Sequence, residues 1–256
     1  MAKGKPDKYK PGRKRLDLLL VELGLIRSRD RAKTMIMSGK VLVNDMVADK
    51  PGAQVRSDAR IKVKEADHPY VSRGGLKLEK AFAAFPVSAK DCVCLDIGAS
   101  TGGFTDCLLK NGAAKVFAVD VGYGQLDWSL RQDDRVVVIE RTNIRHLAYD
   151  QVNEPMDMVV ADTSFISLKT VIPSAEKFMR DGTVILALIK PQFEAGKEHI
   201  GKGGVVKDPA IRQQVVTDIQ TFFDTRGYGV NGVATSPILG PKGNEEYIIH
   251  LEFKKK

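Results

Sequence analysis

The fold is decided by residues 92–109, which read Cys92-Val-Cys-Leu-Asp-Ile-Gly-Ala-Ser-Thr-Gly-Gly-Phe-Thr-Asp-Cys-Leu-Leu109. An apolar run of strand length ends at Asp96, small residues follow it, and a helical pattern begins at Phe104. This order predicts a strand, a tight turn and the start of a helix. The backbone of such a turn can approach a ligand closely, and the helix N-terminus offers free N–H groups to polar ligand atoms.

A second apolar run, residues 116–119, ends at Asp120, where a carboxylate is placed to accept hydrogen bonds from a ribose diol. A phosphate-binding P-loop is disfavoured because Phe104 and Thr105 stand where that motif has Lys and Ser or Thr. The dinucleotide motif G-x-G-x-x-G is broken at residues 98–100. The remaining pattern suits a nucleoside with an amino-acid tail, and a turn that merely connects strand and helix stays the alternative.

The turn is similar to the S-adenosylmethionine site of class I methyltransferases. That resemblance implies S-adenosylmethionine as the cofactor. The polar turn at residues 141–143 is suitably placed to contact an adenine edge. The expected cofactor contacts are Asp96, Gly98, Ser100, Gly102, Gly103, Phe104, Asp120, Asn143 and Asp162.

Composition describes an ordinary globular chain of 256 residues, of which 43% are hydrophobic, with room for one α/β domain and a small companion. No apolar run has the length of a membrane span and the N-terminus has no signal-peptide pattern, so we expect a cytoplasmic protein without membrane contact. The three cysteines lie in or beside the apolar motif and the four histidines are scattered. We therefore expect neither a disulfide framework nor a metal site.

The positive charge is concentrated near the N-terminus. Residues 1–65 carry 17 Lys and Arg against 8 Asp and Glu, a net charge of +9, whereas the whole chain has +8 and the remainder therefore −1. A small basic unit joined to a nearly neutral domain indicates docking to a polyanion, most plausibly nucleic acid. For residues 1–13 alone, a solubilising basic tail is the better interpretation.

Beyond that tail, leucines at helical spacing from Leu16 to Leu23 predict one helix, and Ser28 can cap a second over residues 29–38. Short strands are expected at residues 40–44 and 60–64, with a turn between them. Basic side chains along the second helix could hold RNA phosphates. The candidate RNA contacts are Arg15, Arg27, Arg29, Arg31, Lys33 and Lys40.

The pattern of residues 14–65, above all Gly39-Lys-Val-Leu-Val-Asn44, resembles the S-four RNA-binding domain. A basic helix-turn-helix DNA module is the competing interpretation. Residues 66–71 are expected to be a linker, and residues 72–256 to form a second domain.

The second half alternates strands and helices, as a doubly wound parallel sheet does. Strands are expected at residues 136–140, 156–161 and 183–189, and helices after Asp120, at residues 167–179 and at residues 208–225. A long loop, residues 192–207, could close over substrate. Two final strands, residues 230–237 and 246–253, are consistent with the antiparallel hairpin that completes a class I methyltransferase sheet.

Four ionisable residues, Lys77, Asp162, Lys190 and Glu246, are expected at element ends that face one crevice. Their order and local sequences resemble the tetrad of FtsJ-like ribose 2′-O-methyltransferases, and with the S-four pattern in front, residues 14–253 resemble the TlyA family of rRNA methyltransferases, also called hemolysin A. Glu246 is preferred to Glu245 because it directly precedes Tyr247, as the family's glutamate precedes an aromatic residue.

The resemblance implies that Lys190 is the base, that Lys77 orients the ribose hydroxyl, and that Asp162 and Glu246 hold the two lysines. A lysine acts as a base only when its neutral form is accessible, which burial favours and nearby carboxylates oppose. The implied partner is ribosomal RNA or a ribosomal subunit. A non-catalytic ribosome-binding factor and a membrane-active hemolysin remain the alternatives, and the target nucleotide and oligomeric state stay open.

Overall fold

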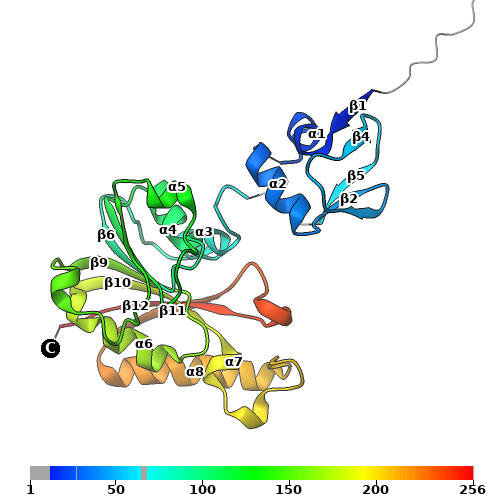
Figure 1. The fold of residues 1–256 in the computed structure, drawn as a ribbon. Coiled ribbons are helices and arrows are strands. Elements are labelled where there is room, and N and C mark those ends of the chain that lie inside the picture. Colours follow the sequence, from blue (N-terminus) through cyan, green and yellow to red (C-terminus); the bar gives the residue numbers. More distant parts are fainter. Residues whose placement is uncertain (1–11, 27, 65–67, 256) are drawn as a thin grey trace, which may run out of the picture. The chain divides into compact units, whose positions relative to one another are not determined.

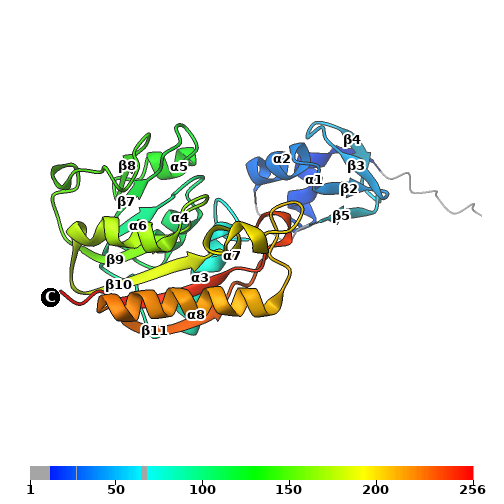
Figure 2. The same cartoon turned by 90° about the horizontal axis from the view of Figure 1, so that it is seen from below.

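The computed structural model describes residues 12–26, 28–64 and 68–255. The chain divides into two compact units, Met1–Pro69 and Tyr70–Lys256. Figures 1 and 2 together label the α-helices and strands of each unit. Each unit has its own hydrophobic core, and each is described by itself below.

In the N-terminal unit, both predicted helices are present. The helix α1 (Leu16–Glu22) and the helix α2 (Arg29–Met37) pack their apolar faces together. The Ser28 side chain accepts a hydrogen bond from the backbone N–H of Arg31 and so caps α2. After α2, Gly39 adopts a left-handed conformation with φ +69°, which ends the helix.

The strands of this unit are more numerous than the sequence pattern indicated. A three-stranded antiparallel sheet has the order β3 (Met46–Ala48), β2 (Val41–Val43) and β5 (Ile61–Val63). A separate pair joins β1 (Arg13–Arg15) to β4 (Gln54–Arg56). The strands β1, β3 and β4 were not predicted, because segments of three residues are too short to show a clear apolar alternation.

The second unit is a seven-stranded sheet with the order β11-β12-β10-β9-β6-β7-β8. All of its neighbouring pairs are parallel except those that β12 makes with β10 and β11. This confirms the predicted doubly wound sheet with a terminal antiparallel pair. The strands are β6 (Val93–Ile97), β7 (Lys115–Val119), β8 (Val136–Ile139), β9 (Met156–Ala161), β10 (Met179–Ile189), β11 (Gly229–Thr235) and β12 (Tyr247–Glu252).

Helices cover both faces of this sheet (Figures 1 and 2). One core lies under α3, α4 and α5, and the other under α6 and α8. Because both faces are covered, the central strands are apolar on both sides, which explains their unbroken hydrophobic runs. The α-helices are α3 (Gly74–Ala84), α4 (Gly103–Lys110), α5 (Trp128–Arg131), α6 (Leu168–Ala175), α7 (Pro191–Glu194) and α8 (Pro209–Arg226).

Three predicted segments differ from the structure. The helix expected after Asp120 is reduced to the four residues of α5, since Gly122 and Gly124 precede it in an irregular loop. The helix α6 ends at Ala175 and continues as a 3-10 turn, Glu176–Phe178. The long loop at residues 192–207 also contains the end of α7 and a 3-10 turn, Lys197–His199.

Candidate active site

The turn between β6 and α4 lies against two other backbone segments, and this proximity explains two of its glycines. A Cβ atom on Gly98, whose φ is +86°, would lie 2.9 Å from the backbone oxygen of Asp162. A Cβ atom on Gly103 would lie 2.3 Å from the Ser72 Oγ and 2.9 Å from the backbone nitrogen of Gly75. Side chains at these positions would push the segments apart, so only glycine keeps the turn in place.

Two cavities meet at this turn, at the carboxyl ends of the strands where open α/β sheets bind ligands. We call the one beside α3 the reaction cavity, with a volume of about 260 Å³, and the one beside β7 the nucleoside cavity, with about 350 Å³. The second volume falls within the range of small-molecule sites. Both cavities are lined by Gly98, Ser100, Asp162 and Ser164.

The nucleoside cavity brings Asp120 and Asn143 together between apolar walls that include Val121 and Ile144. The Asp120 carboxylate accepts backbone hydrogen bonds from Ser100, at 2.8 Å, and from Gly122, at 2.6 Å. Each carboxylate oxygen has a second lone pair, so hydrogen bonds from a diol can be added. The close approach of the turn at Gly98, the carboxylate and the apolar walls together fit an adenosine group.

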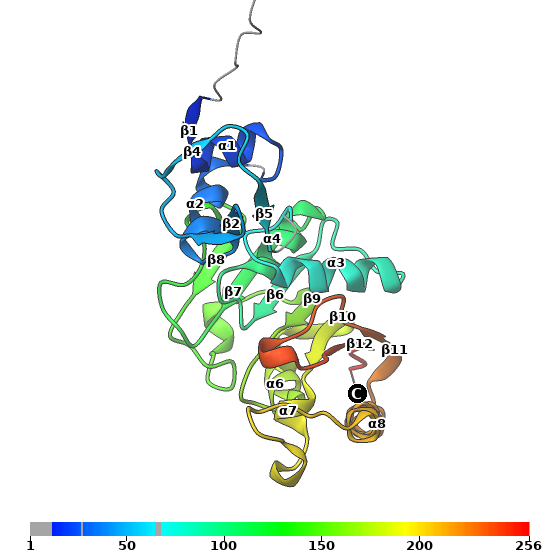
Figure 3. The same cartoon turned by 90° about the vertical axis from the view of Figure 1, so that its right-hand side faces the viewer.

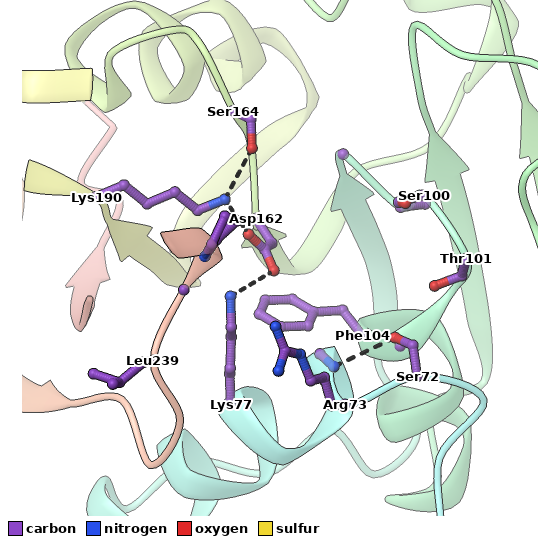
Figure 4. Close-up of a pocket in the computed structure, with 16 residues that line it drawn as sticks. Ser72, Arg73, Lys77, Ser100, Thr101, Phe104, Asp162, Ser164, Lys190 and Leu239 are labelled. Atoms are coloured by element: carbon purple, nitrogen blue, oxygen red, sulfur yellow. Dashed lines mark hydrogen bonds and ion pairs between the residues drawn. The ribbon is translucent and has the colours of Figure 1, made fainter. Parts of the chain in front are cut away.

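The reaction cavity is lined by Lys77, Asp162 and Lys190, three of the four charged residues that the sequence pattern grouped (Figure 4). Lys190 Nζ lies 2.5 Å from Asp162 Oδ1, and Lys77 Nζ lies 3.3 Å from Asp162 Oδ2. Lys77 Nζ also donates to Glu246 Oε2 at 2.8 Å. The Asp162 carboxylate therefore bridges Lys190 and Lys77, and the Glu246 carboxylate also binds Lys77.

Strand register explains how these distant residues meet. In the parallel sheet Ala161 pairs with Ala187 of β10 and with Ile97 of β6, so Asp162 follows β9 beside the ends of both neighbours. Across the antiparallel pair, Ile189 faces Tyr247, which brings Lys190 to the same edge as Glu246. Figure 3 shows the strands β8, β7, β6, β9, β10, β12 and β11 beside one another in this order.

The electrostatics of Asp162 follow from these contacts. Burial by itself would raise the pKa of the Asp162 carboxyl, but the positive charges of Lys190 and Lys77 and their hydrogen bonds outweigh that effect. Its pKa therefore lies below the ordinary value, and the carboxylate stays ionised between the two lysines.

Glu246, which was preferred to Glu245, and Glu245 itself have different contacts. Glu246 is completely buried and bonded to Lys77, whereas Glu245 accepts a hydrogen bond from the Tyr247 hydroxyl and forms an ion pair with Arg212. Glu246 does not line the reaction cavity itself, so it reaches the site only through Lys77.

Two of the expected cofactor contacts have other neighbours. Asp96 is completely buried, lines neither cavity and accepts a hydrogen bond from Thr105 Oγ1 at 2.7 Å. Burial raises the pKa of Asp96 to about 7, against the hydrogen bond from Thr105. Gly102 also lines neither cavity; its φ is +93°, and a Cβ atom there would clash with Leu130 and Leu126. In this structure both residues pack inside the turn, and their contact with a cofactor stays a prediction.

Ser164 contacts a predicted site residue but was not itself predicted from the sequence. Its Oγ accepts a hydrogen bond from Lys190 Nζ at 3.2 Å, and the residue lines both cavities. The only available signal was its place two residues after Asp162 in the loop that follows β9. The other lining residues that were not predicted include Ser72, Arg73, Gln125 and Gly240.

The basic residues of the N-terminal unit are largely engaged with its own acidic groups. Arg15 and Arg29 both bind the completely buried Asp17, at 2.9 and 3.0 Å, and Lys33 binds Asp30 at 2.8 Å. The hydrogen bond from Arg15 lowers the pKa of Asp17 well below its ordinary value despite burial. About half of each guanidinium-bearing side chain remains exposed, 40% for Arg15 and 48% for Arg29.

The other candidate RNA contacts are placed less fully. Arg31 contacts His68 Nε2 at 2.5 Å, and Lys40 begins the segment that leads into β2. Arg27 lies outside the described residues. Within the described part of the chain, no cluster of three or more His, Cys, Asp or Glu is arranged to hold a metal ion, and no helix is long and apolar enough to cross a membrane.

Comparison with known proteins agrees with this architecture. The family model for FtsJ-like methyltransferases matches residues 70–253, and the S4 domain model, the S-four domain named above, matches residues 14–61. The Bacillus subtilis protein YqxC is 49% identical over 94% of this chain and 86% of its own length. The 16S/23S rRNA (cytidine-2'-O)-methyltransferase TlyA of Mycobacterium tuberculosis is 47% identical over 93% of this chain and 90% of its own.

A solved structure of a protein named as a hemolysin, from Streptococcus thermophilus, is 44% identical and superimposes with a TM-score of 0.74. The match covers 96% of this chain and 90% of that one. The chain therefore belongs to the FtsJ-like methyltransferase family, in its TlyA branch, and carries an S4 domain ahead of the methyltransferase domain.

Proposed function

We propose that this protein transfers a methyl group from S-adenosylmethionine to the 2′-hydroxyl of a ribose in ribosomal RNA. The observation that carries the proposal is the convergence of Lys77 and Lys190 on Asp162 where the two cavities join. The TlyA relative, named for cytidine-2'-O-methylation of 16S and 23S rRNA, supports the substrate class. Such a substrate places the reaction in the cytoplasm.

The cofactor would be held by the residues of the nucleoside cavity. Asp120 would accept hydrogen bonds from the ribose diol, and Asn143 would contact the adenine edge. When bound, S-adenosylmethionine supplies a methyl group on a positively charged sulfur. Gly98 and Ser100, which line both cavities, would let the methyl-bearing end reach the junction.

The reaction requires removal of a proton from the ribose hydroxyl during attack. Lys190 in its neutral form would accept that proton at Nζ, and Asp162, 2.5 Å away, would stabilise the resulting ammonium. Lys77, held by Glu246, would donate a hydrogen bond to the hydroxyl oxygen. Alignment of the oxygen with the methyl carbon and the sulfur would supply most of the remaining acceleration.

Mapping 2′-O-methyl groups on rRNA tests this function directly. Ribosomal RNA from cells that lack the protein is compared with RNA from cells complemented by the wild type and by a Lys190→Met variant. We expect one or more 2′-O-methyl sites that depend on the protein and on Lys190. Identical maps in all three would reject the activity and favour a non-catalytic ribosome-binding factor.

The cofactor site yields a separate prediction. Asp120→Ala should weaken S-adenosylmethionine binding by about 1–3 kcal/mol, because the ribose hydroxyls would lose a half-buried acceptor. Isothermal titration calorimetry measures the change. The control is Asp127→Ala, which removes a carboxylate that caps α5 and lines neither cavity. Equal affinity in the folded Asp120→Ala variant and the control would mean that the ribose is held elsewhere.

Docking by the N-terminal unit is also part of the proposal, and the Asp17 contacts decide how to test it. Replacing Arg15 or Arg29 alone would leave a buried carboxylate short of partners, so we choose the triple variant Arg15→Gln, Asp17→Asn, Arg29→Gln. It should weaken rRNA binding. The slope of log K for rRNA against the logarithm of the salt concentration should become shallower by about 1.4–1.8, the value for two phosphate contacts. Filter binding at several salt concentrations measures both, and an unchanged slope would remove these arginines from the interface.

A further inference from the structure

Three lysines of the second unit differ from three candidate RNA contacts of the first. Lys202, Lys207 and Lys242 are exposed, and among the described residues their ammonium groups have no hydrogen-bonded or ion-paired partner. In the N-terminal unit, by contrast, Arg15, Arg29 and Lys33 are already paired with carboxylates. The unpaired lysines can bind an anion without breaking an ion pair within the protein.

These lysines come from two segments that a single buried side chain joins. Asn244, which is 3% exposed, accepts a hydrogen bond from the Val206 N–H at 3.2 Å. Its amide group donates to the Gly204 carbonyl at 2.9 Å and to the Pro241 carbonyl at 3.2 Å. We call residues 201–207 and 239–244 together the strap.

Further bonds give the strap a defined shape. Gly201 and Val205 form an isolated β-bridge, and the Gly240 N–H donates to the Asn244 carbonyl at 2.8 Å. Arg212 of α8 donates to the carbonyls of Val206 and Lys207, at 3.3 and 3.0 Å. These bonds fix the backbone of both segments that carry the three lysines.

The strap is also a wall of the reaction cavity. Leu239, Gly240 and Pro241 line that cavity opposite the turn that follows β6, and Lys242 is the next residue (Figure 4 labels Leu239). A Cβ atom on Gly240 would lie 2.1 Å from Glu246 Oε1, so the strap lies directly on the carboxylate that holds Lys77. A ligand bound to the strap would therefore lie next to the reaction cavity.

We propose that the strap is a second RNA-binding surface, which binds the phosphates flanking the target nucleotide through Lys202, Lys207 and Lys242. The inference rests on the proposed function and adds a contact surface that belongs to the methyltransferase unit itself. Residues 66–256 carry a net charge of −1, so general basicity of this unit does not account for three unpaired cations on one strap whose residues 239–241 line the cavity. A flexible single strand entering the cavity requires charge on its flanks, because base contacts alone do not fix the backbone.

The test compares two triple variants of the full-length protein that remove the same charge. The strap variant is Lys202→Gln, Lys207→Gln, Lys242→Gln. The control is Lys90→Gln, Lys254→Gln, Lys255→Gln, whose exposed lysines precede β6 or follow β12 at the opposite edge of the sheet. Equilibrium binding of transcribed 16S and 23S rRNA is measured by filter binding from 50 to 300 mM KCl.

We expect the strap variant to bind rRNA about 10-fold more weakly than the control at 150 mM salt. The salt slope of log K should be smaller by about 2, the value for three contacts to single-stranded RNA. S-adenosylmethionine affinity should stay unchanged, and the KM for RNA should rise more than kcat falls.

Equal RNA affinity and salt slope in the two variants would overturn the proposal. So would a loss of binding to phosphatidylglycerol vesicles in the strap variant with RNA binding intact, since the surface would then serve a membrane. Failure of the proposed function has a different signature, because a wild-type protein that transfers no methyl group to rRNA can still show the difference in RNA binding.

Discussion

Replacing Lys190 with methionine is expected to lower the single-turnover rate of methyl transfer by at least about 10²–10⁴, the usual effect of losing a general base. Methionine keeps much of the side-chain length and apolar body of lysine but has no amine. Lys190 Nζ contacts Asp162 and Ser164, which line both cavities, so the substitution removes the amine that we propose as the base. Affinities for S-adenosylmethionine and for RNA should persist.

Lys190→Arg separates charge from basicity. The guanidinium restores a positive charge beside Asp162 but stays protonated at any working pH, so it cannot accept a proton. We expect transfer to remain within about 10-fold of the methionine variant. Transfer of labelled methyl at saturating RNA isolates this step from docking. Rates close to wild type in both variants would remove Lys190 from the base role and point to Lys77 or to water.

Asp162→Asn is expected to destabilise the methyltransferase unit by about 3–5 kcal/mol at pH 7, the cost of leaving a buried charge without its partner. The carboxylate is the anion common to Lys77 and Lys190, and its side chain is only 20% exposed. Lys77 would keep Glu246, at 2.8 Å, whereas Lys190 would keep only the neutral Ser164. Urea unfolding of both proteins measures the difference, and methyl transfer should fall as well.

A double variant distinguishes this cause from general disruption. Adding Lys190→Met to Asp162→Asn removes the unpaired cation, so the double variant should be more stable than Asp162→Asn alone. If Lys190→Met lowered the stability of Asp162→Asn further, the unpaired Lys190 would not be the cause of the destabilisation.

The pH dependence supplies a further check on Asp162. Its pKa lies below the unfolded value of about 3.9, so its stabilisation is present above that value and is lost as pH falls through the lower folded pKa. The difference in the free energy of unfolding between wild type and Asp162→Asn should therefore be largest near neutral pH and should shrink as the pH falls through the folded pKa of Asp162. A difference that grew as pH fell would contradict the ion-pair interpretation.

Local patterns predicted the main elements well. The apolar run that ends at Asp96 and the small residues after it form β6 and the turn into α4. Asp208 followed by Pro209 begins α8, with the Asp208 side chain accepting from the Ala210 N–H. Strands and capped helices depend on residues a few positions apart, so a single sequence contains the information for them.

Local patterns predicted less about side chains whose neighbours come from distant parts of the sequence. Asp96 follows the expected pattern of a ligand carboxylate, yet it faces Thr105 inside the unit. Ser164 carries no pattern of its own and becomes part of the site because Lys190 lies 3.2 Å from it. The loop at residues 192–207 was expected to close over substrate, and its connection to residues 239–244 became evident only through the contacts of Asn244.

The sequence by itself determined the two-part organisation, the doubly wound sheet and the identities of Lys77, Asp162, Lys190 and Glu246 as a candidate set. The tertiary structure decided which of them touch. Lys77 is 85 residues from Asp162 and 169 from Glu246, and no local pattern reports a contact across such distances. Strand order and register decide it, because a side chain at a strand end meets only the ends of the strands beside it.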